Sequence, residues 1–250
     1  MTDIILSGCM GKMGHCVAEI VNERDDCRII AGVDVFGGDA CFPVYKSFAD
    51  VRETGDVIID FSNASAVPVL IQYAVKTNTP VVLATTGLDD AQIKLVKQAS
   101  GCVPVFYTAN MSLGVSLVTE LAKMAAKVLG STYDIEIVEM HHRRKLDAPS
   151  GTALMIADSI NGALEEKCVY EYNRHDRREK RPKNEIGIHA VRGGTIVGEH
   201  EVIFAGEDEV VKISHSAGSR RIFASGAVNA AVYLKGKRSG LYTMKDLVSE

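Results

Sequence analysis

The chain has 250 residues, of which 46% are hydrophobic and 24% are charged, and its formal net charge is −4 at pH 7. These values are close to globular averages, so they exclude a largely disordered chain, and the acidic balance argues against a nucleic-acid footprint over the whole surface. No apolar run is long enough to span a bilayer, and the first residues lack the basic segment that opens a secretory signal. We expect a cytoplasmic protein of one or two domains that binds neither membrane nor nucleic acid.

The cysteines and histidines do not suggest a metal or disulfide framework. Six cysteines are scattered without a Cys-x-x-Cys pair, at Cys9, Cys16, Cys27, Cys41, Cys102 and Cys168. In an intracellular chain they are typical of small apolar fillers. His141 and His142 would point to opposite faces of a strand, and no third ligand follows at metal-site spacing. No metal is expected, and His189, His200 and His215, on predicted strands, are expected to be structural.

The first 110 residues alternate short β-rich runs with helical patterns. Strands are predicted at 3–7, 28–33, 56–61, 80–84 and 103–107, and helices at 13–22, 64–76 and 89–99. Apolar strands separated by helices are typical of a parallel sheet covered on both faces. With right-handed crossovers, this part predicts a doubly wound α/β domain.

The pattern changes after residue 111. A long helix is predicted from residue 112 to about 130, then a strand at 134–140, a helix at 151–164 and a solvated charged loop at 174–183. Three strands then follow without intervening helices, at 186–191, 197–204 and 209–215, which indicates an antiparallel or mixed sheet. A last helix at 222–234 can return to the first domain. We therefore expect one domain of residues 1–111 and 220–250, and a second, α+β domain of residues 112–219.

A glycine-rich loop joins the first predicted strand to the first helix, with the sequence Gly8-Cys9-Met10-Gly11-Lys12-Met13-Gly14. Glycines allow the tight turn and let backbone N–H groups approach a pyrophosphate, which a helix N-terminus also attracts. Asp34 ends the second strand, 20 residues past Gly14, where a carboxylate can accept hydrogen bonds from the adenosine ribose. A glycine turn without a ligand is the alternative, but the strand, helix and acid around it favour NADH or NADPH.

The preference between the two cofactors depends on what lies beside Asp34. The next residue is Val35, which offers no cation to a 2′-phosphate, although Lys12 within the loop could serve instead. The sequence therefore favours NADH weakly.

Two further loops follow predicted strands of the same sheet. Ala84, Thr85 and Thr86 close the strand at 80–84, and Thr108, Ala109, Asn110 and Met111 follow the strand at 103–107. Ligands of open α/β sheets bind at the carboxyl ends of strands, so we expect both loops to line the nicotinamide side of the cofactor. Ordinary turn chemistry is an equally good explanation from spacing alone.

A basic cluster follows the strand at 134–140. It contains His141, His142, Arg143, Arg144 and Lys145, and Pro149-Ser150-Gly151-Thr152 then begins a helix. Ser150 is either the N-cap or, with the N–H groups of Gly151 and Thr152, a contact for a carboxylate ligand. Histidine titrates near neutral pH, and a lysine among cations loses its proton more readily, so both types can donate protons. A solvated basic loop before a capped helix is the alternative.

These motifs together resemble the 4-hydroxy-tetrahydrodipicolinate reductase (dihydrodipicolinate reductase) family. The resemblance is carried by His-His-x-x-Lys-x-Asp-Ala-Pro-Ser-Gly-Thr-Ala from residue 141 and by the early Gly-x-x-Gly-x-Met-Gly. It extends over nearly the whole chain, through Val57-Ile-Ile-Asp60-Phe61-Ser62, Gly194-Thr-Ile-Val-Gly198-Glu-His200 and His215-Ser-Ala-Gly-Ser219-Arg220.

The resemblance implies a Rossmann-like cofactor domain and a second domain for substrate binding and oligomerisation, in a homotetramer. The implied reaction reduces (2S,4S)-4-hydroxy-2,3,4,5-tetrahydrodipicolinate to tetrahydrodipicolinate with loss of water, in lysine and diaminopimelate biosynthesis. Residues Gly8 to Met13 would hold the pyrophosphate and Asp34 the ribose. His141 and Lys145 would be the proton donors, and His142, Ser150, Gly151 and Thr152 would contact the small dicarboxylate heterocyclic substrate.

Two other functions stay open at this point. Another amino-acid dehydrogenase of similar build, such as an aspartate or diaminopimelate dehydrogenase, would lack the His-His-x-x-Lys…Pro-Ser-Gly-Thr run. A non-catalytic nucleotide sensor with the same fold would be free to lose His141 or Lys145, yet both are present.

Overall fold

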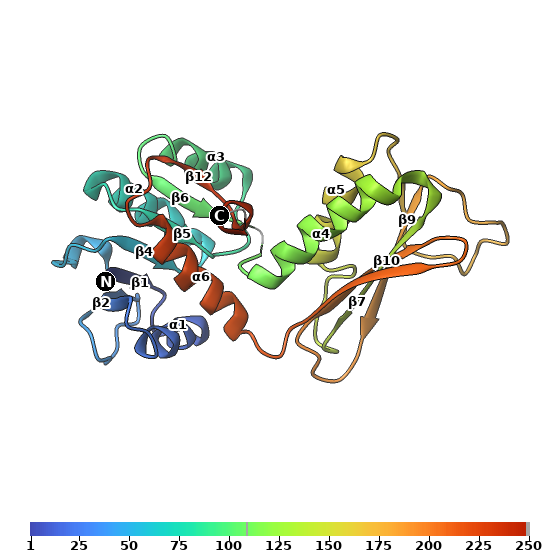
Figure 1. The fold of residues 1–250 in the computed structure, drawn as a ribbon. Coiled ribbons are helices and arrows are strands. Elements are labelled where there is room, and N and C mark those ends of the chain that lie inside the picture. Colours follow the sequence, from blue (N-terminus) through green and yellow to red (C-terminus); the bar gives the residue numbers. More distant parts are fainter. Residues whose placement is uncertain (109, 249–250) are drawn as a thin grey trace. The chain divides into compact units, whose positions relative to one another are not determined.

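The computed structural model describes residues 1–108 and 110–248, and the chain divides into two compact units (Figure 1). Unit 1 comprises Met1–Leu113 and Arg220–Glu250, and unit 2 comprises Gly114–Ser219. The first division falls two residues beyond the expected position, and the second falls where it was expected. No helix within the described ranges is long and apolar enough to cross a membrane.

Unit 1 is built on a seven-stranded sheet in the order β12-β6-β5-β4-β1-β2-β3, and all its pairings are parallel. The strands are β1 (Thr2–Ser7), β2 (Cys27–Val33), β3 (Val44–Tyr45), β4 (Val57–Asp60), β5 (Val81–Leu83), β6 (Pro104–Tyr107) and β12 (Gly240–Tyr242). The chain starts at β1 and winds outward in both directions, so the strand order reverses between β1 and β4. In open α/β sheets this reversal is where ligands bind.

Helices cover both faces of this sheet. One face carries α1 (Lys12–Asn22) and α6 (Arg221–Leu234), and Figure 1 shows α6, in red, running across the sheet. The other face carries α2 (Val67–Thr77) and α3 (Asp90–Ala99). Alternate residues of β1 serve the two layers: Ile4 and Leu6 pack with α1 and α6, and Ile5 packs with α2. The doubly wound parallel architecture predicted from the sequence is confirmed.

Unit 2 combines two main helices with a five-stranded mixed sheet in the order β11-β10-β7-β9-β8. Its elements are α4 (Leu113–Leu129), η3 (Gly130–Thr132), β7 (Asp134–His141), α5 (Gly151–Ala163), β8 (Val169–Glu171), β9 (Glu185–Arg192), β10 (Glu199–Ala205) and β11 (Val210–Ser216). β10 runs antiparallel to β7 and β11, whereas β7 and β8 run parallel to β9. The predicted mixed sheet is therefore confirmed.

One face of the unit 2 sheet packs against α4 and α5. The core includes Ile135 and Ile137 of β7, Ile186 and Ile188 of β9, and Val202 and Phe204 of β10, together with small and apolar residues of both helices. Because side chains alternate along a strand, Glu139 and His141 lie on this same face beyond the apolar residues. The core thus continues into a polar cluster at the carboxyl end of β7.

The charged stretch 174–183 is a loop and most of its residues are exposed, as the sequence indicated, but Arg181 is an exception. Arg181 is only 16% exposed and reaches the carboxylates of Asp134, at 2.7 Å, and Glu136, at 2.9 Å. It also donates to the carbonyls of Ile135 and Glu185. The sequence did not indicate that this exposed loop is tied to the acidic residues at the start of β7.

Periodicity also missed three strands and a helix. β3, β8 and β12 have two or three residues each, and the helix α7 (Met244–Val248) has five. Such short elements contain too few residues to show a repeat.

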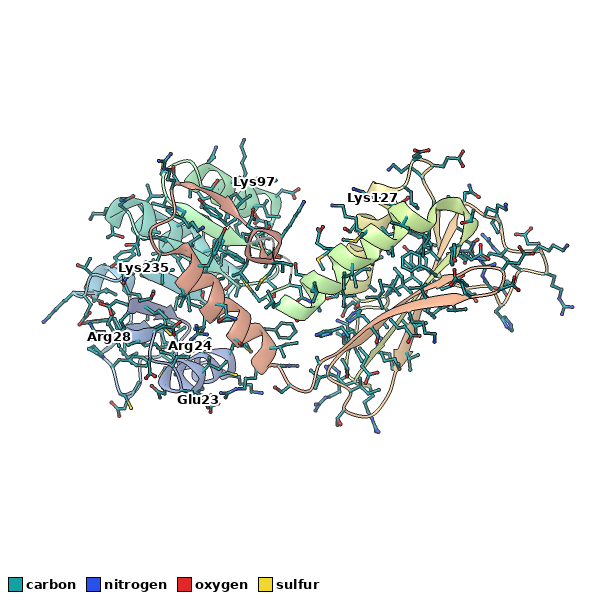
Figure 2. All side chains as sticks on the ribbon, in the orientation of Figure 1. Glu23, Arg24, Arg28, Lys97, Lys127 and Lys235 are labelled. Atoms are coloured by element: carbon teal, nitrogen blue, oxygen red, sulfur yellow. The ribbon has the colours of Figure 1, made fainter. Side chains whose placement is uncertain are left out.

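Ion pairs near the surface join the end of α6 to the segment before β4, and β2 to β1. Lys235, labelled in Figure 2, lies 2.9 Å from the carboxylate of Asp56 and 2.7 Å from the carbonyl of Met1. Arg28, also labelled, pairs with Asp3 at 2.6 Å. Exposed pairs contribute about 0–1 kcal/mol each, so the buried core decides the fold.

Candidate active site

A pocket of about 640 Å³ opens at the carboxyl ends of β1, β2 and β4 in unit 1. It lies beside the reversal of strand order between β1 and β4. Its lining comes from the glycine loop, from the segments after β2, β3 and β4, and from the first turns before α2: Ser7, Gly8, Met10, Gly11, Val33, Asp34, Val35, Phe36, Lys46, Ser47, Phe48, Phe61, Ser62, Asn63, Ser65, Ala66 and Val69. Its size suits part of a dinucleotide.

The glycine loop has the geometry that a pyrophosphate site requires. Gly8 has a φ of 74°, and a Cβ there would lie 2.6 Å from the carbonyl oxygen of Phe61. A Cβ on Gly14 would overlap the carbonyl oxygen of Gly8, so α1 can approach β1 this closely only without a side chain. Gly11 precedes α1 and offers no side chain to cap its first N–H groups. The positive end of α1 is thus arranged to attract an anion.

Other residues of the loop contribute backbone rather than side chains. Cys9 is 2% exposed and packs in the core, where burial raises the pKa of its thiol to about 11. Met13 also packs against that core. Lys12, the first residue of α1, is exposed and is not part of the pocket lining.

Asp34 and Lys46 stand next to each other at the ends of β2 and β3. The parallel pairing of Val33 with Tyr45 brings them together, and Asp34 N–H donates to the carbonyl of Tyr45 at 2.9 Å. The Asp34 carboxylate accepts hydrogen bonds of 3.1 Å from the N–H groups of Met10 and Phe36. The pocket therefore contains an acid fixed against the glycine loop, with a lysine beside it that the sequence did not single out.

The loop after β5 is held by a buried carboxylate. Asp60 is 0% exposed, and its oxygens accept hydrogen bonds of 2.6 Å from the hydroxyls of Ser62 and Thr85. Burial raises the pKa of Asp60. The Thr85 hydroxyl is thus committed to Asp60, while Ala84 is half-buried and Thr86 is exposed.

The segment after β6 is tied by its own side chains. The Thr108 hydroxyl donates to the carbonyl of Asn110 at 3.4 Å, and the Asn110 side chain accepts from the N–H of Ser112 at 2.8 Å. Met111 is 4% exposed and packs in the core. Ala109, the remaining residue predicted here, lies outside the described residues.

In unit 2, His141 ends β7 and is paired with a buried glutamate. Its Nδ1 lies 2.6 Å from Oε2 of Glu139, which is 0% exposed. Arg192, at the end of β9, donates to both oxygens of Glu139 at 2.8 and 2.7 Å, and the N–H of Ser150 donates to Oε1 at 3.0 Å. Burial alone would raise the pKa of Glu139, but the hydrogen bonds from Arg192 and His141 bring it below its ordinary value. Glu139 is therefore an ionised acceptor.

His200, which was expected to be structural, lies against His141. The two rings meet edge to face with centroids 5.3 Å apart, and His200 Nε2 is 3.1 Å from the Ser150 hydroxyl. Burial lowers the pKa of His200 to about 4, so its ring is neutral at neutral pH. The antiparallel register of β10 on β7, which pairs His200 with Glu139, places it there.

Lys145 and the start of α5 complete this cluster. The ammonium of Lys145 lies 2.8 Å from the carboxylate of Asp147. Ser150 is the N-cap of α5, and its hydroxyl accepts from the N–H of Ala153 at 3.1 Å. Of the two alternatives for Ser150, the structure shows the cap. Gly151 and Thr152 then form the first turn of the helix.

The structure thus groups His141, His142, Lys145 and residues 150–152 in unit 2 and the glycine loop with Asp34 in unit 1. Sequence reasoning did not single out Glu139, Arg192 or Lys46, and it did not place His200 beside His141. Alternation along β7 could have placed Glu139 on the face of His141, but the other three depend on strand register. Among residues 1–108 and 110–248, no group of three or more His, Cys, Asp or Glu side chains is placed to hold a metal ion.

A larger pocket, of about 840 Å³, lies at the other end of the unit 2 sheet. It is lined by residues at the starts of β7 and β9 and by Lys127 of α4, labelled in Figure 2. None of the predicted site residues borders it, so volume alone does not identify the site.

Comparison with known proteins agrees with the motifs. The family model for the N-terminus of dihydrodipicolinate reductase matches residues 2–111, and the model for its C-terminus matches residues 114–248. The 4-hydroxy-tetrahydrodipicolinate reductase of Caldanaerobacter subterraneus subsp. tengcongensis is 54% identical over 250 residues, covering 100% of this chain and 99% of the relative. That of Clostridium novyi is 45% identical over 249 residues, covering 99% and 98%.

A solved structure has the same fold. Dipicolinate-bound dihydrodipicolinate reductase from Paenisporosarcina sp. TG-14 superimposes with a TM-score of 0.82 at 24% identity, covering 99% of both chains. The family predicted from the sequence is confirmed, and the chain belongs to the 4-hydroxy-tetrahydrodipicolinate reductase (dihydrodipicolinate reductase) family of NAD(P)H-dependent oxidoreductases.

Proposed function

We propose that this protein reduces (2S,4S)-4-hydroxy-2,3,4,5-tetrahydrodipicolinate to tetrahydrodipicolinate with a nicotinamide cofactor and loss of water. The observation that carries the proposal is the cluster in unit 2, where His141, bound to the buried Glu139, shares one loop with Lys145 and the start of α5. Relatives that match nearly the whole chain carry this activity in their names.

Unit 1 would hold the cofactor, which supplies the hydride when bound. The backbone of residues 8–13 and the start of α1 would bind the pyrophosphate, and Asp34 would accept hydrogen bonds from the adenosine ribose. The segments 84–86 and 108–111 would lie along the nicotinamide. NADH is favoured because a 2′-phosphate would meet the negative charge of Asp34, whereas Lys46 beside it gives NADPH partial compensation.

Unit 2 would hold the substrate, which carries two carboxylates on a ring. The Paenisporosarcina relative holds dipicolinate, a planar ring with two carboxylates. In this chain, His142, Lys145 and the N–H groups of Gly151 and Thr152 would bind such groups, because cationic donors and a helix N-terminus both favour carboxylates. Ser150 would stabilise this helix N-terminus as its cap, because its hydroxyl accepts the hydrogen bond of the Ala153 N–H.

The proton chemistry would belong to His141 and Lys145. Hydride addition to a conjugated ring leaves negative charge on it, and a positioned acid that neutralises the charge accelerates the step by about 10²–10⁴-fold. His141 Nε2 would supply that proton, since Nδ1 is engaged with Glu139. Lys145 would be the second proton donor and would also bind a carboxylate.

Substitution of the two donors tests the proposal. With freshly made ring substrate, His141→Gln should lower kcat by about 10²–10⁴-fold, measured as loss of NADH absorbance, with little change in KM. Lys145→Ala should lower kcat and raise KM together. His175→Gln, an exposed loop histidine in the same unit, is the matched control. A normal kcat in His141→Gln, or no NADH or NADPH oxidation by the wild type, would refute the proposal.

Assembly and location form part of the same proposal. We propose a cytoplasmic homotetramer joined through the unit 2 sheet, since an intersubunit sheet would cover its edge strands, β11 and β8. Light scattering of the purified protein should give four chains per particle.

A further inference from the structure

The carboxylate of Glu139 is buried and accepts hydrogen bonds from three separate segments of unit 2. It receives His141 Nδ1, both terminal nitrogens of Arg192 and the backbone N–H of Ser150. Buried ion pairs contribute little net stability, because removing both charges from water offsets their attraction. The Glu139–Arg192 pair is therefore better explained by the residues that it holds in place.

We propose that Glu139 and Arg192 are positioning residues for the reduction, holding His141 in one tautomer and fixing the loop that carries Lys145. This inference rests on the proposed function, and it assigns a purpose to two residues that do not themselves contact the ring. Glu139 would act through His141, and Arg192 would act through Glu139 and the 142–150 loop.

The tautomer follows from the hydrogen bonds. Arg192 keeps Glu139 ionised, and an ionised carboxylate only accepts hydrogen bonds, so Nδ1 of His141 must carry the hydrogen in the contact of 2.6 Å. Nε2 is then the atom through which the neutral ring accepts a proton and the charged ring donates one. A carboxylate behind a histidine serves the same purpose in catalytic triads and metal sites.

The same pair reaches Lys145 through the backbone. Arg192 Nη2 donates to the carbonyl of Asp147 at 2.6 Å, and the Asp147 carboxylate holds Lys145 at 2.8 Å. The Ser150 N–H on Glu139 fixes the other end of that loop, where α5 begins. Both proton donors are therefore held by one carboxylate–guanidinium pair.

Strand β7 provides a matched control in Glu136. This glutamate also binds an arginine and a histidine, with Arg181 Nε at 2.9 Å and His189 Nε2 at 2.8 Å. It lies three residues from Glu139 and, by alternation, on the opposite face of the sheet. Glu136→Gln therefore removes an equivalent carboxylate from the same strand without touching His141.

The test compares the full-length variants Glu139→Gln and Glu136→Gln by steady-state kinetics and by ¹⁵N NMR of the histidine rings. Glu139→Gln should lower kcat by about 10–100-fold with a smaller change in KM, and His141 should lose its Nδ1–H signature and show mixed tautomers. Glu136→Gln should leave both unchanged. The double variant Glu139→Gln/His141→Gln should lose less activity than the product of the two single losses, because part of the effect of Glu139 passes through His141.

Two conservative variants keep the test decisive if Glu139→Gln does not fold. Glu139→Asp keeps the charge but shortens its reach, and Arg192→Lys keeps the charge but loses the two-pronged contact. Either one, if folded, should show a lower kcat. A folded Glu139 or Arg192 variant with normal kcat and an unchanged tautomer would overturn the inference and leave the proposed function intact, whereas an active His141→Gln would refute the function itself.

Discussion

Two histidines whose rings are in contact, His141 and His200, have different surroundings. His141, at the end of β7, has its Nδ1 on the ionised Glu139, whereas His200, 5% exposed, meets the Ser150 hydroxyl and has no carboxylate partner in the described part of the chain. Burial therefore lowers the pKa of His200 to about 4. A neutral ring beside His141 avoids repulsion with a charged imidazole, which suits a residue that exchanges protons.

The low pKa of His200 predicts a specific loss of stability in acid. Between pH 6.5 and 4 the unfolded chain binds a proton at residue 200 that the folded chain does not, so the stabilisation is present above pH 6.5 and is lost as pH falls towards about 4. From about pH 7.5 to about pH 5 the loss should be about 2 kcal/mol. In urea unfolding, His200→Gln should lose about 2 kcal/mol less stability than the wild type over this pH range, with His175→Gln as control. Equal losses in wild type and His200→Gln would contradict the prediction.

The contact between β1 and α1 depends on the absence of a side chain at one position. A Cβ on Gly14 would overlap the Gly8 carbonyl oxygen and lie 2.6 Å from the carbonyl carbon of Cys9. Both are backbone atoms that cannot rotate away. The helix can therefore bring its N-terminus to the loop only if residue 14 is glycine.

Two alanine substitutions in this loop should have different effects. Gly14→Ala should destabilise the protein by about 1–3 kcal/mol and weaken NADH binding, because α1 must move away from β1. Gly11→Ala is the control for stability, since its Cβ would lie 3.3 Å from the Gly8 carbonyl oxygen and its φ of −77° suits any residue. Thermal unfolding and calorimetry would check both. A Gly14→Ala variant as stable as Gly11→Ala would show that α1 tolerates the displacement.

Local patterns predicted much of the fold and the part of the site that is continuous in sequence. Hydrophobic periodicity predicted the main helices and the mixed sheet of unit 2, and the loop sequences predicted Asp34 and His141 as site residues. The contacts of His141 with Arg192 and His200 could not be predicted, because they depend on how β9 and β10 align with β7. Period-2 alternation gives the face of a residue but not its partner across the sheet.

The two units differ in how the chain builds their cores. The described residues of the unit 2 core all come from within 114–219, so that unit is continuous. Unit 1 also requires residues from 220 onward, since α6 contributes a row of buried residues to one face of its sheet: Ala224, Ala227, Val228, Ala230, Ala231 and Leu234. β12 also pairs with β6 at the edge of that sheet.

A fragment of unit 2 should therefore fold alone, whereas the first segment of unit 1 should not. Residues 114–219 expressed alone should give a cooperative thermal transition by circular dichroism, because their core is complete. Residues 1–113 should bind a dye for exposed apolar surface and unfold without a sharp transition, because Ile4, Leu6 and Ile59 lose the cover of α6. Cooperative unfolding of the 1–113 fragment would contradict this view of unit 1.

Because unit 1 is built from two separate segments of the chain, its parts are synthesised at different times. The segment that forms β1 to β6 is made before residues 114–219, so another 106 residues are synthesised before α6 begins. During that interval the apolar face that α6 will complete is covered by α1 alone, and β6 has an open edge, which is the kind of surface that promotes association between nascent chains. Chaperones that bind apolar segments on translating ribosomes therefore have a defined target in this chain, and the part that is begun first is finished last.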